Sequence, residues 1–238
     1  MKEAAIIIPT IGSDFVWEAI ESALSQTYKN AKIYLVIDGE DHLIKVWPKM
    51  IENELGTNAK ILIYPLRENT GANGQNGHRI YSAFSFLSNS DYIFYLDQDC
   101  FFDNNHVESC IDLIETQDLQ WCYSLRKIVS KSGEYICNDD CESLGKYRPI
   151  FDYNLCDTNT YCIKRDVAML VSPYFVGGWG HDRRYFQVLS SNFQKFECTG
   201  KYSVNYRLGG DNNLTGDFWK EYNSIVENQN NGKFPWRK

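Results

Sequence analysis

Asp-Tyr-Ile-Phe-Tyr-Leu-Asp-Gln-Asp, residues 91–99, is an apolar run that leads directly into two aspartates. A short run without polar alternation is typical of a strand buried on both faces of a sheet. We therefore expect a strand over residues 91–96. Asp97 and Asp99 would follow its carboxyl end, which is where parallel sheets bind their ligands.

Three similar runs precede this stretch, at residues 4–8, 33–37 and 60–64. Apolar residues with helical spacing separate them, although Pro48 weakens the second of these helices. Strand and helix in alternation predict an α/β fold with a parallel sheet and helices on both faces. The carboxyl ends of the strands would then carry Thr10, Asp38, the Gly- and Asn-rich loop 65–77 and the 97–99 segment.

The second half of the chain is less regular. Residues 120–129 and 134–137 are expected to form a hairpin, and residues 161–163 are expected to return as a strand beside the sheet. A glycine-rich loop at 177–180 precedes a helix from about 181 to 189. Residues 215–226 would form an amphipathic helix that directs inward Phe218, Trp219, Tyr222, Ile225 and Val226. One domain is the simplest account.

Composition excludes several classes of protein. The 238 residues are 43% apolar and 23% charged, which is unlike a disordered chain. The net charge of −7 disfavours a nucleic-acid partner, since phosphate contacts need clustered Lys and Arg. No apolar run approaches the ~20 residues of a membrane span, and the N-terminus does not resemble a signal peptide. We expect a cytoplasmic protein.

The eight cysteines are expected to be reduced thiols. The alternative is a four-thiolate zinc site, but its spacings are looser than those of zinc ribbons; it would use Cys137, Cys141, Cys156 and Cys162. The C-terminal residues 233–238 mix aromatic and basic side chains. They could touch an anionic membrane surface, or pack back onto the protein.

Asp97 and Asp99 are the first candidates for chemistry. Carboxylate oxygens suit Mg²⁺ or Mn²⁺, which usually take one or two carboxylates together with substrate phosphates. Aspartates that only satisfy loop amides are the alternative. Asp38 could accept an N–H from a nucleotide base or simply form a turn. Arg79 could bind phosphate oxygens or pair locally.

His181 and Asp182 follow the glycine-rich loop at the expected start of a helix. The carboxylate of Asp182 could act as a general base toward a substrate hydroxyl. It could equally stabilise the helix as a first-turn aspartate. Trp179 could stack on a sugar ring or belong to the core.

Four segments, taken in order, resemble family 2 glycosyltransferases of the A-type fold. These are the strand Ile6–Thr10 with the following helix, Leu35–Gly39, Asp91–Asp99, and Gly177–Asp182 with Tyr206 and Arg207. The resemblance covers roughly residues 4–210. It implies a Rossmann-like, mostly parallel sheet with a smaller acceptor-side sheet. The expected parts of the single domain are residues 1–116 for the donor, 117–210 for the acceptor and catalysis, and 211–238 for a C-terminal helix and tail.

The resemblance also implies roles. It places Thr10, Asp38, Arg79 and Asp97 at a nucleotide-sugar donor, most simply a UDP-sugar. Asp97 and Asp99 would hold Mn²⁺ or Mg²⁺, and Asp182 would be the catalytic base of an inverting transfer. The acceptor, a glycan or lipid-linked glycan, would meet Gly178, Trp179 and His181. Two departures are visible, since Ile37 stands where a second acid is common and His181 where glutamate is usual.

A bacterial surface polysaccharide or lipopolysaccharide acceptor, with peripheral contact at the inner face of the membrane, is the expected setting. Two alternatives stay open. A nucleotidyltransferase would make a nucleotide-sugar, although residues 9–13 lack the basic residues typical of such enzymes. A non-catalytic binding module of the same fold would have little use for all three aspartates. The sequence does not indicate the oligomeric state.

Overall fold

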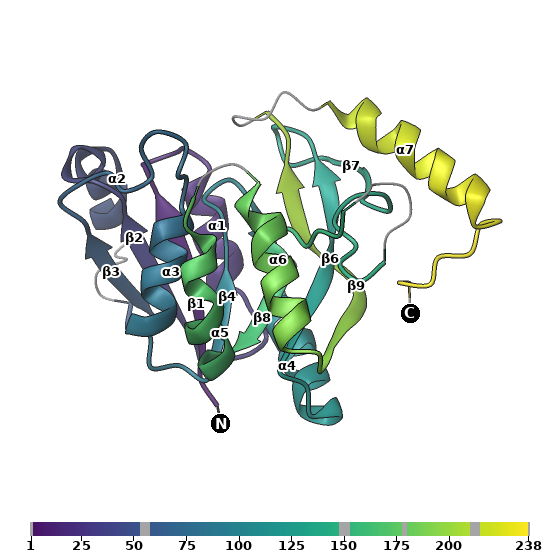
Figure 1. Cartoon of the computed structure of the whole chain (residues 1–238). Helices are drawn as coiled ribbons and strands as arrows, with labels where there is room; N and C mark the ends of the chain where they lie inside the picture. The colour runs from purple at the N-terminus through teal and green to yellow at the C-terminus, as the bar shows by residue number, and fades with distance from the viewer. Residues whose placement is uncertain (1, 53–57, 148–152, 178–179, 210–214, 238) are drawn as a thin grey trace.

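A computed structural model describes residues 2–52, 58–147, 153–177, 180–209 and 215–237 (Figure 1). The strands are β1 (Ala4–Thr10), β2 (Ala31–Ile37), β3 (Ile61–Pro65), β4 (Tyr92–Tyr95), β5 (Phe101–Phe102), β6 (Trp121–Val129), β7 (Tyr135–Asn138), β8 (Tyr161–Lys164) and β9 (Phe196–Arg207). The helices are α1 (Val16–Leu24), α2 (Glu40–Glu52), α3 (His78–Leu87), α4 (His106–Gln117), α5 (Arg165–Val171), α6 (His181–Asn192) and α7 (Gly216–Gln229), with short 3-10 turns η2 (Thr158–Thr160) and η3 (Ser172–Phe175).

The described strands form one continuous sheet in the order β3-β2-β1-β4-β8-β6-β9-β5, with β7 paired to β6. The first four are parallel to one another. β8 then pairs antiparallel with both β4 and β6. The expected α/β fold is confirmed, and the strands of the second half of the chain continue the first-half sheet through β8.

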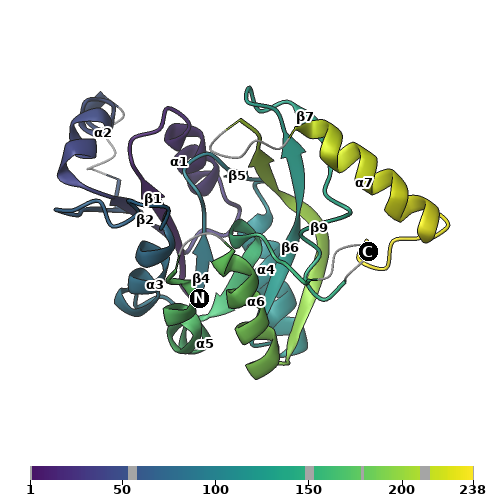
Figure 2. The same cartoon turned by 45° about the horizontal axis from the view of Figure 1, so that its top comes forward.

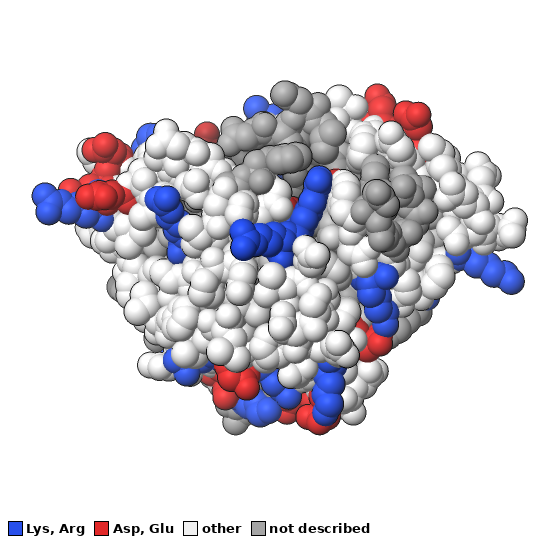
Figure 3. Space-filling model, viewed as in Figure 1, with Lys and Arg blue, Asp and Glu red and all other residues white. Residues whose placement is uncertain are grey.

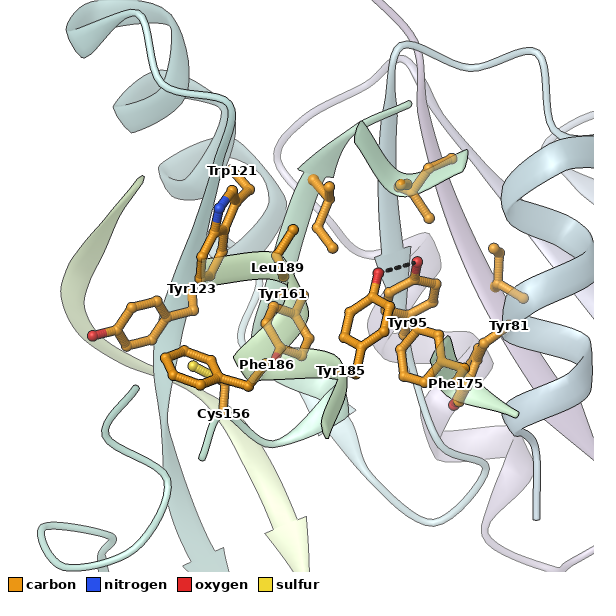
Figure 4. Close-up of a cluster of buried hydrophobic side chains, with 14 of the residues drawn as sticks. Tyr81, Tyr95, Trp121, Tyr123, Cys156, Tyr161, Phe175, Tyr185, Phe186 and Leu189 are labelled. Atoms are coloured by element: carbon orange, nitrogen blue, oxygen red, sulfur yellow. Dashed lines mark hydrogen bonds between the residues drawn. The ribbon is translucent and has the colours of Figure 1, made fainter. Parts of the chain in front are cut away.

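Helices cover both faces of the sheet, as the alternating pattern predicted. Along β1, Ala5 and Ile7 enter one apolar cluster, while Ala4, Ile6 and Ile8 enter the other. Figure 1 shows α3, α5 and α6 in front of the sheet. Their cluster is rich in aromatic rings, and the Tyr95 and Tyr185 hydroxyls are hydrogen-bonded at 3.2 Å inside it (Figure 4). β1 and β4 are therefore buried on both faces, which explains their continuous apolar runs.

Several elements differ from the sequence expectation. α2 runs through Pro48, and β9, the longest strand, was not predicted. β9 pairs parallel with β6 along its length, a long-range contact that leaves little local signal. Ile225 does not point inward: it is 38% exposed, whereas Trp219 and Val226 on the same helix are buried.

The C-terminal tail packs back onto the protein. Trp236 is 2% exposed, and its indole Nε1 donates a hydrogen bond to Asp140 Oδ1 at 2.7 Å. Arg237 also pairs with Asp140. Figure 2 shows α7 and the tail at the β7 side of the molecule, away from α3 and α5. Of the two expectations for this tail, packing back is confirmed.

Candidate active site

The two aspartates after β4 are partly buried and lie close together. Tyr81 donates its hydroxyl to Asp97 Oδ1 at 2.7 Å, and Asn159 Nδ2 donates to Oδ2 at 2.8 Å. Burial, and then the charges of Asp99 and Asp157, raise the pKa of Asp97 to about 7. Burial also raises the pKa of Asp99. A cation placed here would relieve this concentration of negative charge.

Gln98, between the two aspartates, fastens the segment to the loop after β1. Its Oε1 accepts hydrogen bonds from Thr10 Oγ1 at 2.8 Å, Ile11 N at 3.1 Å and Ser13 N at 3.3 Å. The Thr10 hydroxyl in turn accepts from Gly12 N at 3.0 Å. The structure therefore places the predicted donor residue Thr10 directly beside the aspartate segment.

Asp38 is buried at the end of β2 and holds the glycine-rich loop. Its Oδ1 accepts from the backbone N and the hydroxyl of Thr70, at 2.7 and 2.9 Å, and its Oδ2 accepts from Gly71 N at 2.8 Å. A Cβ at Gly71 would lie 2.4 Å from the Asn76 carbonyl oxygen, so the tight loop requires glycine. Arg79 is exposed and donates to the Thr70 carbonyl at 3.2 Å. Thr70 thus joins two predicted donor residues.

Asp182 lies in the first turn of α6, and Arg183 N donates to its Oδ1 at 2.8 Å. Burial raises the pKa of Asp182; the nearby charge of Asp157 adds to the rise, and the charge of Arg183 opposes it. A partly buried carboxyl with a raised pKa is suited to accept a proton. The predicted acceptor residues Gly178 and Trp179 lie outside the described residues.

His181 connects the start of α6 to the start of α3. Its ring packs on Gly177, where a Cβ would lie 1.9 Å from Cε1, so glycine is required there. Across from it, burial and then the charge of His181 lower the pKa of His78 to about 4. The His78 ring also stacks on Phe175 with centroids 5.9 Å apart. Both imidazoles therefore lie in the packed junction between the two helices.

The charge of Asp157 acts on all three of the predicted catalytic and metal-binding aspartates. Asp157 immediately precedes η2, and its charge raises the pKa values of Asp97, Asp99 and Asp182. These three residues come from the end of β4 and the start of α6, which are distant in sequence. The fold therefore brings the expected metal ligands and the expected base into one electrostatic neighbourhood.

Behind Asp157 lies Arg126, which is 3% exposed and binds three carboxylates. Its Nε donates to Asp139 Oδ2 at 2.7 Å, its Nη1 to Asp157 Oδ2 at 2.6 Å and its Nη2 to Glu142 Oε2 at 2.6 Å. The guanidinium also lies 4.3 Å from the ring centroid of Tyr206. We call this arginine with its three acids the Arg126 cluster. One positive charge for three negative ones leaves the cluster acidic.

The residues present fit a divalent cation. In the described part of the chain, Asp97, Asp99 and Cys100 are the group of three potential ligands whose ligand atoms lie within 4.8 Å of one another. Burial raises the pKa of the Cys100 thiol well above its usual value, so the sulfur stays protonated and is a poor ligand. Two hard carboxylates remain, as Mg²⁺ or Mn²⁺ would require. All eight cysteines are free thiols, and the suggested four-thiolate group is not assembled among the described residues.

Sequence reasoning missed Asn159, Asp157, Tyr81 and the Arg126 cluster. One signal was available, because Arg126 lies in a mostly apolar strand and a buried arginine needs partners. Arg207, noted only as part of a segment, donates Nε to the Asp99 carbonyl at 3.0 Å and also pairs with Glu18. No local pattern marks Asn159, since its partner is 62 residues away.

Comparisons with known proteins agree with this geometry. The family model "Glycosyl transferase family 2" matches residues 5–174. No match to a curated protein was found. No described helix combines the length and hydrophobicity needed to cross a bilayer.

Solved structures show the same fold at low sequence identity. Residues 1–349 of S. aureus TarS in complex with UDP superpose with a TM-score of 0.64 and 11% identity, over 96% of this chain and 71% of that one. The UDP-GlcNAc complex of the same TarS fragment gives a TM-score of 0.65 and 12% identity, over 95% of this chain and 66% of that one. Against the longer TarS structure, this chain spans 43% of the length, with a TM-score of 0.61 and 10% identity.

Proposed function

The chain belongs to glycosyl transferase family 2, and from this premise we propose that it is an inverting glycosyltransferase. The donor is a UDP-sugar carrying a hexose or an N-acetylhexosamine, and the acceptor is a hydroxyl of a glycan or glycolipid. The observation that carries the proposal is the geometry at the end of β4, where Asp97 and Asp99 offer carboxylate oxygens that lie within 4.8 Å of each other. The UDP and UDP-GlcNAc complexes of TarS support the choice of nucleotide.

In this proposal the donor lies along the carboxyl ends of β1, β2 and β4. Asp38 meets the base, while Thr10, Arg79 and Asp97 contact the rest of the donor. Asp97 and Asp99 would hold Mn²⁺ or Mg²⁺, which, when bound, neutralises charge on the departing diphosphate. Residues 1–116 thus form the donor half, and residues 117–210 carry the acceptor side and the base.

Asp182 acts as the general base. One of its carboxylate oxygens takes the proton from the acceptor hydroxyl, and that hydroxyl oxygen attacks the anomeric carbon from the face opposite UDP. The bond to the new oxygen forms as the bond to the diphosphate oxygen breaks, which inverts the anomeric configuration. His181, next to Asp182 at the start of α6, would border the acceptor.

The first test measures UDP release and sugar transfer from a panel of UDP-sugars, with and without Mn²⁺. Asp182→Asn should lower kcat by about 10²- to 10⁴-fold while UDP still raises the melting temperature. Asp217→Asn is the matched control, because Asp217 is also a first-turn aspartate but lies on α7. If the two substitutions lowered kcat equally, Asp182 would only stabilise its helix.

Two results would redirect the proposal. Pyrophosphate release from a nucleoside triphosphate and a sugar phosphate would identify a nucleotidyltransferase. UDP binding without transfer or hydrolysis of any donor would identify a binding module. We place the enzyme in the cytoplasm, in the synthesis of a bacterial surface polysaccharide or lipopolysaccharide, and a screen of lipid-linked and free glycans tests that setting.

Peripheral contact with a membrane is better served by the α3 and α5 side than by the packed tail. Leu87 and Leu170 are 65% and 67% exposed there, and Phe86 is 47% exposed. Figure 3 shows basic side chains toward the middle of this face, and both basic and acidic ones along its lower edge. Arg165, whose Nη2 donates to the Phe86 carbonyl at 3.4 Å, adds a positive charge beside these apolar side chains, as suits an anionic bilayer surface. Leu170→Glu should reduce co-sedimentation with phosphatidylglycerol vesicles, and Ile225→Glu on α7 should not. If both variants sediment equally with the vesicles, the proposed membrane contact is wrong.

A further inference from the structure

Asn159 is a fully buried amide that joins Asp97 to the Arg126 cluster. It lies in the short turn η2, just before β8. Its Nδ2 donates to Asp97 Oδ2 at 2.8 Å and to Asp157 Oδ1 at 2.7 Å, and its Oδ1 accepts from the backbone N of Asp97 at 2.6 Å. A primary amide has two donor hydrogens and one acceptor oxygen, and all of them are used here.

These contacts hold Asp97 by its backbone and its carboxylate together. The Asn159 amide binds the backbone N–H of Asp97 and one oxygen of its carboxylate. Tyr81 holds the other oxygen from the opposite side, at 2.7 Å. Rotation of the Asp97 side chain would break at least one of these buried hydrogen bonds, which is costly where water cannot replace them.

Asn159 is itself held from behind. Its backbone N donates to Asp157 Oδ1 at 2.9 Å, and Asp157 Oδ2 accepts from Arg126 Nη1 at 2.6 Å. Because Arg126 is buried among three carboxylates and the Tyr206 ring, the anchor has little freedom to move. The series Arg126, Asp157, Asn159, Asp97 is therefore a continuous hydrogen-bonded support from β6 to the end of β4.

An amide is the side chain that this position requires. Asn159 lies between two carboxylates, so it must donate to both, and an aspartate of the same shape would offer no donor to either. An aspartate would also add a negative charge beside Asp97, whose pKa the charges of Asp99 and Asp157 already raise. Replacing Asn159 with Asp therefore removes the two hydrogen-bond donors while it keeps the shape of the side chain.

We propose that Asn159 is a positioning residue, anchored by Asp157 and Arg126, that holds Asp97 in the orientation that binds the divalent cation and the donor diphosphate. The inference rests on the proposed function and adds to it a residue that touches neither donor nor acceptor. Groups that orient metal ligands in this way typically contribute 10- to 100-fold to metal affinity or activity.

The test compares Asn159→Asp with Asn205→Asp. Asn205 is a matched control, since it is 5% exposed and its Nδ2 also donates to an aspartate, Asp103, at 2.9 Å, outside the site. Mn²⁺ binding in the presence of UDP is followed by loss of the free-ion electron paramagnetic resonance signal. The apparent Mn²⁺ constant for transfer and kcat at saturating Mn²⁺ are measured in parallel.

Asn159→Asp should weaken Mn²⁺ binding by about 10- to 100-fold, and excess Mn²⁺ should restore most of kcat. Asn205→Asp should leave the Mn²⁺ constants unchanged. Tyr81→Phe serves as a second variant that keeps the ring in the core and frees the other oxygen of Asp97. It should raise the Mn²⁺ requirement by a smaller factor, and it decides the matter if Asn159→Asp does not fold.

Two failures are distinguishable. If the wild-type protein shows no Mn²⁺-dependent UDP binding, the proposed function falls and the inference falls with it. The second case is a wild-type protein that binds UDP and Mn²⁺. If Asn159→Asp and Tyr81→Phe then bind Mn²⁺ as tightly as Asn205→Asp does, only the positioning role is overturned.

Discussion

Two groups of buried acids lie at either end of Asn159, and they differ in what balances their charge. In the Arg126 cluster, each of three carboxylates receives its own N–H from one guanidinium. Asp97 and Asp99 form no ion pair within the described chain, and burial together with neighbouring acids raises their pKa values. Buried charges of the first kind support the fold, while those of the second kind are suited to bind a cation.

The strongest test of this difference between the two groups removes the Arg126 guanidinium. Arg126→Met keeps an unbranched apolar stem but leaves the three carboxylates without their positive partner. We expect a loss of about 3–5 kcal/mol in the free energy of unfolding, measured by urea denaturation at pH 8. Arg126→Lys should lose less, because it keeps the charge without the three-way geometry. An undiminished stability for Arg126→Met would show that the cluster does not depend on its arginine.

The next effect should have the opposite sign. Asp97→Asn removes a charge that burial disfavours, so it should stabilise the metal-free protein in EDTA at pH 8. We expect about 2 kcal/mol, which is half of the free energy that a three-unit pKa shift would give, because solvent partly reaches the site. Tyr81 can accept from the new amide while Asn159 still donates to its oxygen.

The pH dependence fixes the sign of this prediction. Because the folded-state pKa of Asp97 is raised to about 7, this carboxyl makes wild type lose stability as pH rises from the unfolded value toward 7, and Asp97→Asn lacks this contribution. Their difference should therefore vanish near pH 4. The variant should also lose the Mn²⁺-dependent increase in melting temperature. A variant less stable than wild type at pH 8 would mean that Asp97 is balanced by a charge already present.

A smaller effect should connect Asp157, in the Arg126 cluster, with the proposed base Asp182. Burial raises the pKa of Asp182, and the charge of Asp157 adds to it. Since the base works unprotonated, kcat/KM should fall on the acid side at a higher pH than an ordinary aspartate would give. Asp157→Asn should move this acid limb to lower pH, whereas Asp217→Asn should not. An unmoved limb in Asp157→Asn would place the titrating group elsewhere.

The smallest effect concerns the outermost acid of the Arg126 cluster. Burial raises the pKa of Glu142, so Glu142→Gln removes a charge that the fold holds poorly and keeps an acceptor for Arg126. We expect a change within about 0.5 kcal/mol in the free energy of unfolding.

Asp139 provides the contrast for that measurement. Its pKa is lowered, and it accepts backbone N–H groups from Glu142 at 2.8 Å and Ser143 at 3.0 Å as well as the guanidinium. Asp139→Asn should therefore cost clearly more than Glu142→Gln in the same urea series. Equal costs would mean that the three acids of the cluster are equivalent.

Much of residues 1–116 could be predicted because the signals there are local. β1, β2 and β4 are buried on both faces, so their sequences are continuous apolar runs, and Asp38, Asp97 and Asp99 follow their carboxyl ends directly. The structure of the second half of the chain was harder to predict. β9 depends on pairing with β6, and Ile225 fits an apolar helical stripe that the protein does not bury.

The sequence by itself determined the order of strands and helices, the family, and the residue types that could bind a cation or take a proton. These follow from hydrophobic periodicity and from the ends of strands, which are properties of neighbouring residues. Only the tertiary structure decided which acids pair with a guanidinium and which form no ion pair among the described residues. Charge balance depends on partners far apart in the chain, such as Asn159 with Asp97 and Arg126 with Asp157, and burial strengthens those interactions only once the chain has folded.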